Sequence, residues 1–236
     1  MLGQELNRTI VISEAIDEVV AKEVITLIMA INKFDAEMEA TILGYQAEAI
    51  EIIINSGGGS ASDGFAIIGA MEMSATPIVT YGVGMVASMA LAIFLAGDVR
   101  ISTRHTRYMY HSVSYGFGGH ITDHEEQLIE SNVINKMYDE VILDNTTLSE
   151  DELQEIRRVK KDYFMSALEA EELGLVDYVV DKPEKRAEIL KELQEEGNEE
   201  ESEVAIEIKS EASSPKLTQD DTFILEDKEF TSFFNK

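Results

Sequence analysis

Apolar and polar positions follow two periods along the first 180 residues, and strand patterns alternate with helix patterns. β-Branched residues at 50–54 lead into the glycine-rich segment 55–59, and a helical pattern follows over 61–73. A second strand pattern at 78–81 precedes an all-apolar helical pattern at 89–96. This repeated strand-turn-helix unit predicts an α/β domain.

Three helix starts are marked by a serine or threonine with a glutamate three residues later, a pattern in which side chain and backbone cap each other. The first should open a long helix that reaches about Asp144, and the last a short helix that Gly174 ends. The pairs are Thr122 with Glu125, Ser149 with Glu152, and Ser166 with Glu169, and further strands are expected at 99–102, 108–110 and 176–180.

The apolar pattern weakens near residue 181, where glutamate-rich stretches begin. We therefore divide the chain into a domain at 1–182 and an acidic extension at 183–236, which is expected to be helical at first and then mostly flexible. The extension is either a solubilising tail or a docking segment, in which Phe230, Phe233 and Phe234 would contact a partner or a sister subunit.

Composition restricts the classes of function. The formal net charge of −27 disfavours binding to nucleic acid or to an anionic membrane. The longest near-apolar run, 83–97, is shorter than the roughly 20 residues that cross a bilayer, and no signal peptide is visible. The chain has no cysteine, which excludes disulfides and thiolate metal sites, so we expect a cytoplasmic protein without metal or cofactor.

Ser88 stands where a glycine-containing turn meets the apolar helix pattern at 89–96. It is either a simple helix N-cap or a nucleophile at a helix start, whose free N–H groups suit a developing oxyanion. The G-x-S-x-G pattern of α/β-hydrolases is absent, because Val86 and Ala90 occupy the glycine positions.

Three glycines at 57–59 directly follow a strand pattern, where the backbone can approach a ligand closely. A tight strand-to-helix turn is the alternative explanation of this run. Neither G-x-x-x-x-G-K-[ST] nor G-x-G-x-x-G is matched, so nucleotide binding is disfavoured.

A serine nucleophile needs a base, and the base needs a carboxylate that fixes its tautomer. His111 is the best-placed histidine because it ends a strand pattern, whereas His105 lies in a basic loop. His120 and His124 have the i, i+4 spacing of a metal pair but lack a third ligand, which favours a solvated helix face.

Asp162 is the candidate acid, because the apolar residues 163–165 follow it directly and predict a position against apolar surface. The alternative is an ordinary surface charge near the basic residues of 157–161. Sequence pattern alone does not decide between the two.

Four ordered motifs over roughly residues 7–182 resemble the Clp protease proteolytic subunit (ClpP) family. The family patterns are I-N-S-P-G-G, G-x-A-A-S-M-[AG], R-x-M-x-H, and D-x-F-[ML]-S-A-x-E-A followed by G-L-[IV]-D. Their counterparts in this chain are 54–59, 84–90, 107–111, and 162–170 followed by 174–177.

This resemblance implies the ClpP/crotonase α/β fold, built of repeated β-turn-α units with a long handle helix, and serine endopeptidase activity. It implies Ser88 as nucleophile, His111 as base and Asp162 as acid. It also implies that the backbone N–H groups of Gly58 and Met89 form the oxyanion hole.

The resemblance further implies that an unfolded or extended polypeptide is bound as an added strand beside Gly58 and Gly59. Hydrolysis would take place inside a homo-oligomeric chamber of two stacked seven-membered rings, which the handle helix joins. An AAA+ unfoldase is a candidate partner. The acidic extension resembles that of ClpP-like proteases of tailed phages, for which capsid proteins are candidate partners.

The chain departs from the family pattern at several places. Gly57 replaces a proline, Ser112-Val113 replaces Gln-Pro, and the segment 35–49 is longer. The first strand lies almost at the start, so the usual pore-lining segment is not evident and coupling to an unfoldase stays open. A catalytically inactive ring or scaffold subunit and a crotonase-type acyl-CoA enzyme are the competing interpretations.

Overall fold

The computed structural model describes residues 6–116, 118–182, 185, 188, 189 and 191. The chain divides into two compact units, Met1–Ala187 and Glu188–Lys236, and the elements from β1 to β7 belong to the first. At the start of the extension, where a helix is expected, the four residues that are described are helical. The candidate docking residues Phe230, Phe233 and Phe234 lie outside the described residues.

A seven-stranded sheet forms the centre of the first unit, in the order β1-β2-β3-β4-β7. These five strands are parallel, as strands joined by helical crossovers must be. β5 pairs in parallel with the far end of β3, and β6 pairs antiparallel with β5. The strands are β1 (Thr9–Ile12), β2 (Ile50–Ser56), β3 (Ile78–Ala87), β4 (Val99–Thr103), β5 (Arg107–Tyr110), β6 (Tyr163–Ser166) and β7 (Tyr178–Val180). The predicted α/β class is confirmed.

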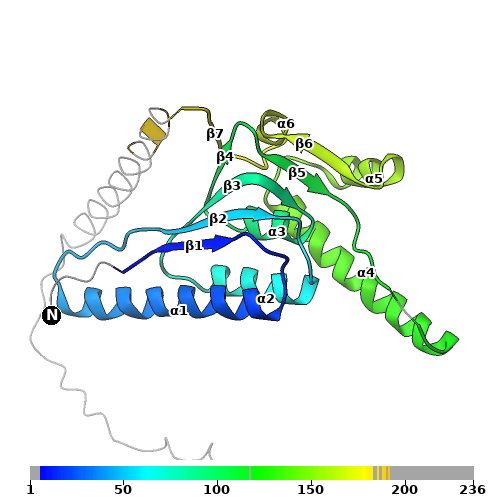
Figure 1. The fold of residues 1–236 in the computed structure, drawn as a ribbon, viewed down its shortest axis with the longest axis horizontal. Helices are drawn as coiled ribbons and strands as arrows, with labels where there is room; N and C mark the ends of the chain where they lie inside the picture. Colours follow the sequence, from blue (N-terminus) through cyan, green and yellow to red (C-terminus); the bar gives the residue numbers. More distant parts are fainter. Residues whose placement is uncertain (1–5, 117, 183–184, 186–187, 190, 192–236) are drawn as a thin grey trace, which may run out of the picture. The chain divides into compact units, whose positions relative to one another are not determined.

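Three helices fill the crossovers between the first four strands. They are α1 (Glu18–Thr41), α2 (Ala61–Glu72) and α3 (Met89–Leu95). Figure 1 shows α1 and α2 side by side beneath β1 to β3. Ile50, Ile52 and Ile54 of β2 are fully buried, which explains the β-branched residues in the sequence of this strand.

α3 is buried along its whole length, in keeping with its all-apolar sequence. It packs so closely on α2 that a Cβ atom added to Gly64 would lie 2.2 Å from Cγ of Met89. Glycine at position 64 therefore makes room for the side chain that follows Ser88.

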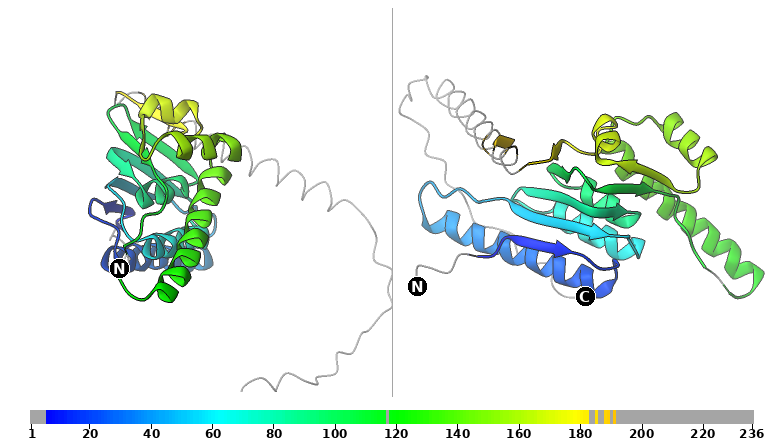
Figure 2. Two further views of the ribbon diagram at one scale, coloured as in Figure 1. Left: turned by 90° about the vertical axis from the view of Figure 1, so that its right-hand side faces the viewer. Right: turned by 45° about the horizontal axis from the view of Figure 1, so that its top comes forward.

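Three further helices complete the unit: α4 (Ile121–Asp144), α5 (Glu150–Val159) and α6 (Ala167–Glu172). The capping boxes predicted at Ser149 and Ser166 are confirmed. The one predicted at Thr122 is wrong, because α4 already begins at Ile121 and its N-cap, His120, makes no side-chain cap bond. α4 extends beyond the sheet (Figures 1 and 2), and residues 121–130 are all exposed.

A polar network lies where β1, β2 and β3 begin. The carboxylate of Asp35, near the end of α1, accepts bonds from both terminal nitrogens of Arg8, from Tyr45 Oη at 2.6 Å and from Thr76 Oγ1 at 2.6 Å. The Arg8 guanidinium is the main reason that the pKa of Asp35 falls to about 2. This network ties α1 to the strand starts.

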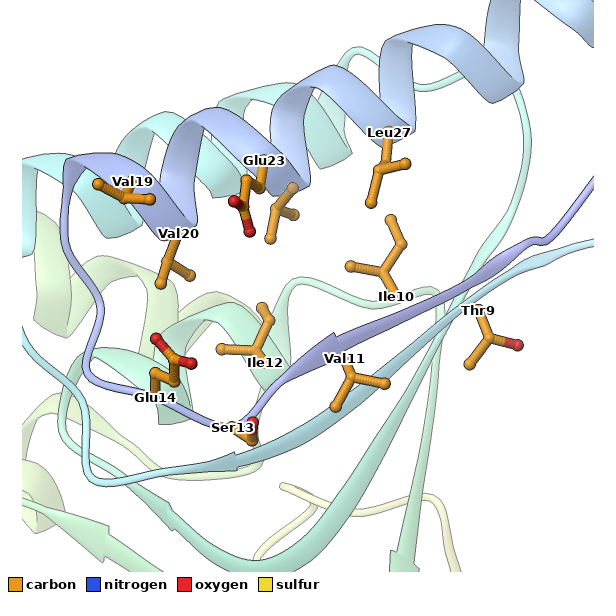
Figure 3. A pocket seen from close by; sticks show the side chains of 11 residues that line it. Thr9, Ile10, Val11, Ile12, Ser13, Glu14, Val19, Val20, Glu23 and Leu27 are labelled. Atoms are coloured by element: carbon orange, nitrogen blue, oxygen red, sulfur yellow. The ribbon is translucent and has the colours of Figure 1, made fainter.

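A hollow of about 250 Å³ lies between β1 and the first half of α1 (Figure 3). Its lining includes the exposed Val11, Val19 and Leu27, and Figure 3 shows Glu23 pointing into it. The serine and histidine identified from sequence do not line it. In the described part of the chain, no helix is long and apolar enough to span a membrane.

Candidate active site

Ser88 has an unusual backbone conformation, with φ 55° and ψ −130°. It is the one non-glycine residue with positive φ in the described part of the chain. Such a conformation costs about 1–3 kcal/mol and is found preferentially at functional sites. The side chain makes no cap bond to α3, so the N-cap interpretation of Ser88 does not hold.

Three hydrogen bonds hold the strained Ser88 backbone. Its N–H donates to the carbonyl of Met109 in β5 at 2.9 Å. Its carbonyl accepts from the Leu91 N–H at 2.9 Å and from the hydroxyl of Tyr138 in α4 at 3.0 Å. β5 and α4 therefore fix the serine from outside its own β3–α3 turn.

The imidazole of His111 lies against the Ser88 hydroxyl, with Nε2 2.8 Å from Oγ. β5 ends at Tyr110, directly before this histidine, and runs parallel to the end of β3, directly before this serine. The chain thus brings the two side chains together at the carboxyl ends of adjacent strands, where open α/β sheets place their sites.

Asp162 precedes β6, which pairs antiparallel with β5 up to Tyr110 opposite Tyr163. Continued by one step, this register would set His111 opposite Asp162, and directly opposite residues have Cβ atoms about 5 Å apart. The carboxylate makes no hydrogen bond to His111 in the described structure, and it is exposed. The expectation that it lies against apolar surface is wrong, because β6 turns Met165 inward and Phe164 outward.

Gly58 lies directly against the serine turn. A Cβ atom added to it would be 2.6 Å from Ser88 Cβ and 2.9 Å from the backbone nitrogen of Met89, so only glycine fits, and its φ of 92° also favours glycine. The Met89 N–H opens α3 and has no acceptor within that helix. The Gly58 N–H, however, donates to Ser56 Oγ at 3.2 Å.

Gly59 pairs with Ile16 as an isolated parallel bridge. Ile16 donates its N–H to the Gly58 carbonyl at 3.0 Å and accepts from the Ser60 N–H at 2.8 Å. In this pattern the N–H and C=O of Gly59 itself point to the opposite side. That side offers backbone groups to an added strand.

One turn of α4 beneath the serine-histidine pair was missed by the sequence analysis. Tyr138 is 3% exposed and stacks on Tyr110, with ring centroids 5.6 Å apart and an interplanar angle of 1°. Tyr110 donates to Asp139 at 2.7 Å, and the Val113 N–H donates to Asn135 at 2.9 Å. The i, i+3, i+4 spacing of the three α4 residues was the available signal, since it places them on one helix face.

The other histidines lie apart from this arrangement. His124 faces the ring of Tyr115, with centroids 6.1 Å apart, while His105 and His120 are exposed. In the described residues, no group of three or more His, Cys, Asp or Glu side chains could hold a metal ion.

Comparison with known proteins defines first the class of fold and then the family. A point mutant of ClpP1 from Listeria monocytogenes matches with a TM-score of 0.64 at 23% identity, covering 75% of this chain and 93% of that one. The fold is therefore that of ClpP.

The sequence matches the Clp protease family over residues 4–183. The ATP-dependent Clp protease proteolytic subunit of Deinococcus radiodurans is 29% identical over 178 residues, which are 75% of this chain and 81% of that protein. The chain belongs to the Clp protease family.

Proposed function

We propose that this protein is a serine endopeptidase in which Ser88 is the nucleophile, His111 the base and Asp162 the acid that orients the base. The observation that carries the proposal is the 2.8 Å contact between His111 Nε2 and Ser88 Oγ at a strained serine. Membership of the Clp protease family supports the same reaction. The crotonase-type alternative finds no support in this match.

In the proposed reaction, Ser88 Oγ attacks the carbonyl carbon of a peptide bond while His111 Nε2 takes the hydroxyl proton. The tetrahedral oxyanion forms, and the C–N bond breaks as His111 returns that proton to the leaving amine. Water then attacks the acyl ester while His111 takes a proton from it. The ester C–O bond breaks as His111 returns this proton to Ser88 Oγ, which releases the carboxylate product and regenerates the serine. A carboxylate at Asp162 would stabilise the imidazolium formed in both halves.

The proposed oxyanion hole consists of the backbone N–H groups of Met89 and Gly58. Contact of Gly58 with the serine turn supports this assignment. Gly58 must release its bond to Ser56 to serve as a donor. The outward-facing backbone of Gly59 supports binding of an extended polypeptide as an added strand.

Covalent labelling with a fluorophosphonate tests the proposal directly. The wild-type chain should be labelled at Ser88, as located by peptide mass spectrometry, and hydrolyse fluorescein-labelled casein. Ser88→Ala should abolish both signals, whereas Ser62→Ala, an exposed serine on α2, should leave both unchanged. Equal labelling of Ser88→Ala and the wild type would remove the proposed nucleophile.

The proposal extends to assembly and partners. We propose homo-oligomeric stacked heptameric rings in the cytoplasm, with α4 between the rings. The exposed apolar residues of α4, among them Ile121, Leu128 and Ile129, support an interface on this helix. Native mass spectrometry should give a mass of 14 subunits. Pulldown with an AAA+ unfoldase or with phage capsid protein would identify which of the two partners applies.

A second candidate, a catalytically inactive ring subunit, is favoured by the engagement of the Gly58 N–H with Ser56 and by the missing bond between Asp162 and His111. Ser56→Ala frees that N–H without touching the serine-histidine pair. If the wild type resists labelling while Ser56→Ala reacts, the native chain is a closed subunit. Equal reactivity of both proteins argues against this candidate.

A further inference from the structure

One turn of α4 contacts both segments that carry the serine-histidine pair. We call Asn135, Tyr138 and Asp139 the α4 clamp. Tyr138 is 50 residues from Ser88 in sequence. Each of the three side chains nevertheless forms a hydrogen bond with the serine turn or with the segment around His111. The clamp thus links two segments that belong to different strands.

On the serine side, the clamp acts through a single hydroxyl. Tyr138 donates to the carbonyl of Ser88, the residue with strained backbone. Burial raises the pKa of Tyr138 well above its usual value, so the phenol stays protonated and remains a donor at all working pH values. The second bond to this carbonyl, from Leu91, comes from α3, while the Ser88 N–H donates to Met109 in β5, so Tyr138 supplies the one bond in the described structure that joins the Ser88 backbone to α4.

On the histidine side, the clamp holds the chain before and after His111. Tyr110, the residue before it, stacks on Tyr138 and donates to Asp139. Val113, two residues after it, donates its N–H to Asn135. The imidazole is therefore carried by a short segment that is fixed at both ends to the same turn of α4.

The clamp is itself anchored. Asp139 Oδ2 accepts from Asn135 Nδ2 at 2.9 Å and from Arg157 Nη2 of α5 at 2.7 Å. Asp139 is 7% exposed, and these bonds, together with the one from Tyr110, give its carboxylate three donors. Three donors on one buried carboxylate restrict the positions that the Asp139 side chain can take.

We propose that the α4 clamp sets the distance between Ser88 Oγ and His111 Nε2, with Tyr138 as its principal positioning residue. This inference rests on the proposed peptidase function for its kinetic consequence, whereas its geometric consequence holds independently. Tyr138 touches neither substrate nor the reacting atoms. Packing alone does not explain a tyrosine at position 138, since a phenylalanine ring would fill the same space without the hydroxyl.

The kinetic experiment compares fluorophosphonate inactivation of the full-length wild type and Tyr138→Phe. Loss of one positioned hydrogen bond should lower kinact about tenfold and leave KI unchanged. Tyr110→Phe, which keeps the bond to Ser88, should lower kinact about threefold. A kinact for Tyr138→Phe within twofold of the wild type would overturn the proposal.

Tyr45→Phe is the matched control for stability. Like Tyr138, Tyr45 donates one hydrogen bond through its hydroxyl. Its acceptor is the buried carboxylate of Asp35 at the far end of the sheet. Its loss should lower the urea midpoint and leave kinact unchanged. If Tyr45→Phe and Tyr138→Phe lower kinact equally, the effect is one of general stability and the clamp proposal fails.

Crystal structures of the wild type and Tyr138→Phe separate the clamp from the proposed function. The Oγ–Nε2 distance should lengthen from 2.8 Å to beyond about 3.5 Å in the variant. An unchanged distance overturns the clamp whether or not the protein hydrolyses peptides. A lengthened distance in a protein whose wild type is never labelled supports the clamp and refutes the proposed function.

Discussion

Two buried aspartates at opposite ends of the sheet have opposite electrostatic character. Asp35, where the strands begin, is 4% exposed, and Asp139, beneath the serine-histidine pair, is 7% exposed. Each pairs with an arginine and accepts from a tyrosine. Yet the pKa of Asp35 is lowered to about 2, mainly by the Arg8 bonds, while burial raises the pKa of Asp139.

The difference lies in the geometry of the arginine. Arg8 grips both oxygens of Asp35 with its two terminal nitrogens, the arrangement that stabilises a carboxylate most strongly. Arg157 reaches Asp139 through Nη2, and its Nε is buried without a partner in the described structure. The start of the sheet therefore supplies stability, whereas the end near Ser88 tolerates strain and an imperfectly paired charge.

The largest effect expected is the loss of activity in His111→Ala. Without the proposed base, casein hydrolysis should fall on the order of 10⁶-fold, because a serine nucleophile and its base act as a unit. The urea midpoint should change little, since the side chain is part-exposed at the end of the sheet. Residual hydrolysis within tenfold of the wild type would contradict the proposed mechanism and place the catalytic group elsewhere.

Asp35→Ala is the converse change, aimed at the stabilising end. It leaves the Arg8 guanidinium buried without its carboxylate and should lower the free energy of unfolding by about 3–5 kcal/mol, measured by urea denaturation. Fluorophosphonate kinact should stay the same below the transition. The control is Glu37→Ala, which removes an exposed i, i+4 pair with Lys33 and should cost no more than about 0.5 kcal/mol.

Lowering the pH should reveal the contribution of Asp35 to the free energy of unfolding. Its pKa is lowered on folding from 3.8 to about 2, so the stabilisation is fully present above 3.8 and is lost as the pH falls through about 2. The shift corresponds to about 2 kcal/mol. Urea midpoints at intervals from pH 5 to 2 should fall more steeply for the wild type than for Asp35→Asn, and parallel curves would contradict the assignment.

A smaller effect of opposite sign is expected at Asp139. Because its pKa is raised on folding, its ionised form is disfavoured, and stability from this group is gained as the pH falls through the raised value and lost as it rises. Asp139→Asn should remove this gain, which is fully present below the ordinary value of 3.8 and is lost as the pH rises through the raised pKa. A variant whose urea midpoint follows the wild-type pH dependence would show that Asp139 does not titrate in this way.

Sequence pattern predicts the local features of this fold and fails where contacts are distant. The capping boxes at Ser149 and Ser166 are local, since each pairs residues three apart, and both form. Thr122 fits the same pattern but lies inside α4, because the helix already begins one residue earlier, at Ile121. No helix was predicted over 18–41, where the structure forms α1.

For the site, sequence and resemblance led to Ser88, His111 and Asp162, and the structure brings the first two into contact. The positive φ of Ser88 could not be predicted, because it is held by distant partners: the Ser88 N–H donates to Met109, and the Ser88 carbonyl accepts from Tyr138. The prediction that Asp162 lies against apolar surface was wrong, because the three apolar residues that follow it are in a strand and face alternate sides of the sheet. Its role stays a prediction.

The contact between Gly64 and Met89 has an evolutionary consequence. The side chain next to the serine fills space that a methyl group on α2 would occupy. A relative with alanine at the position of Gly64 should therefore carry a smaller residue beside its serine, and the two substitutions should be inherited as a compensating pair. Alanine at position 64 alone would force the Met89 side chain, or the turn that carries it, to shift.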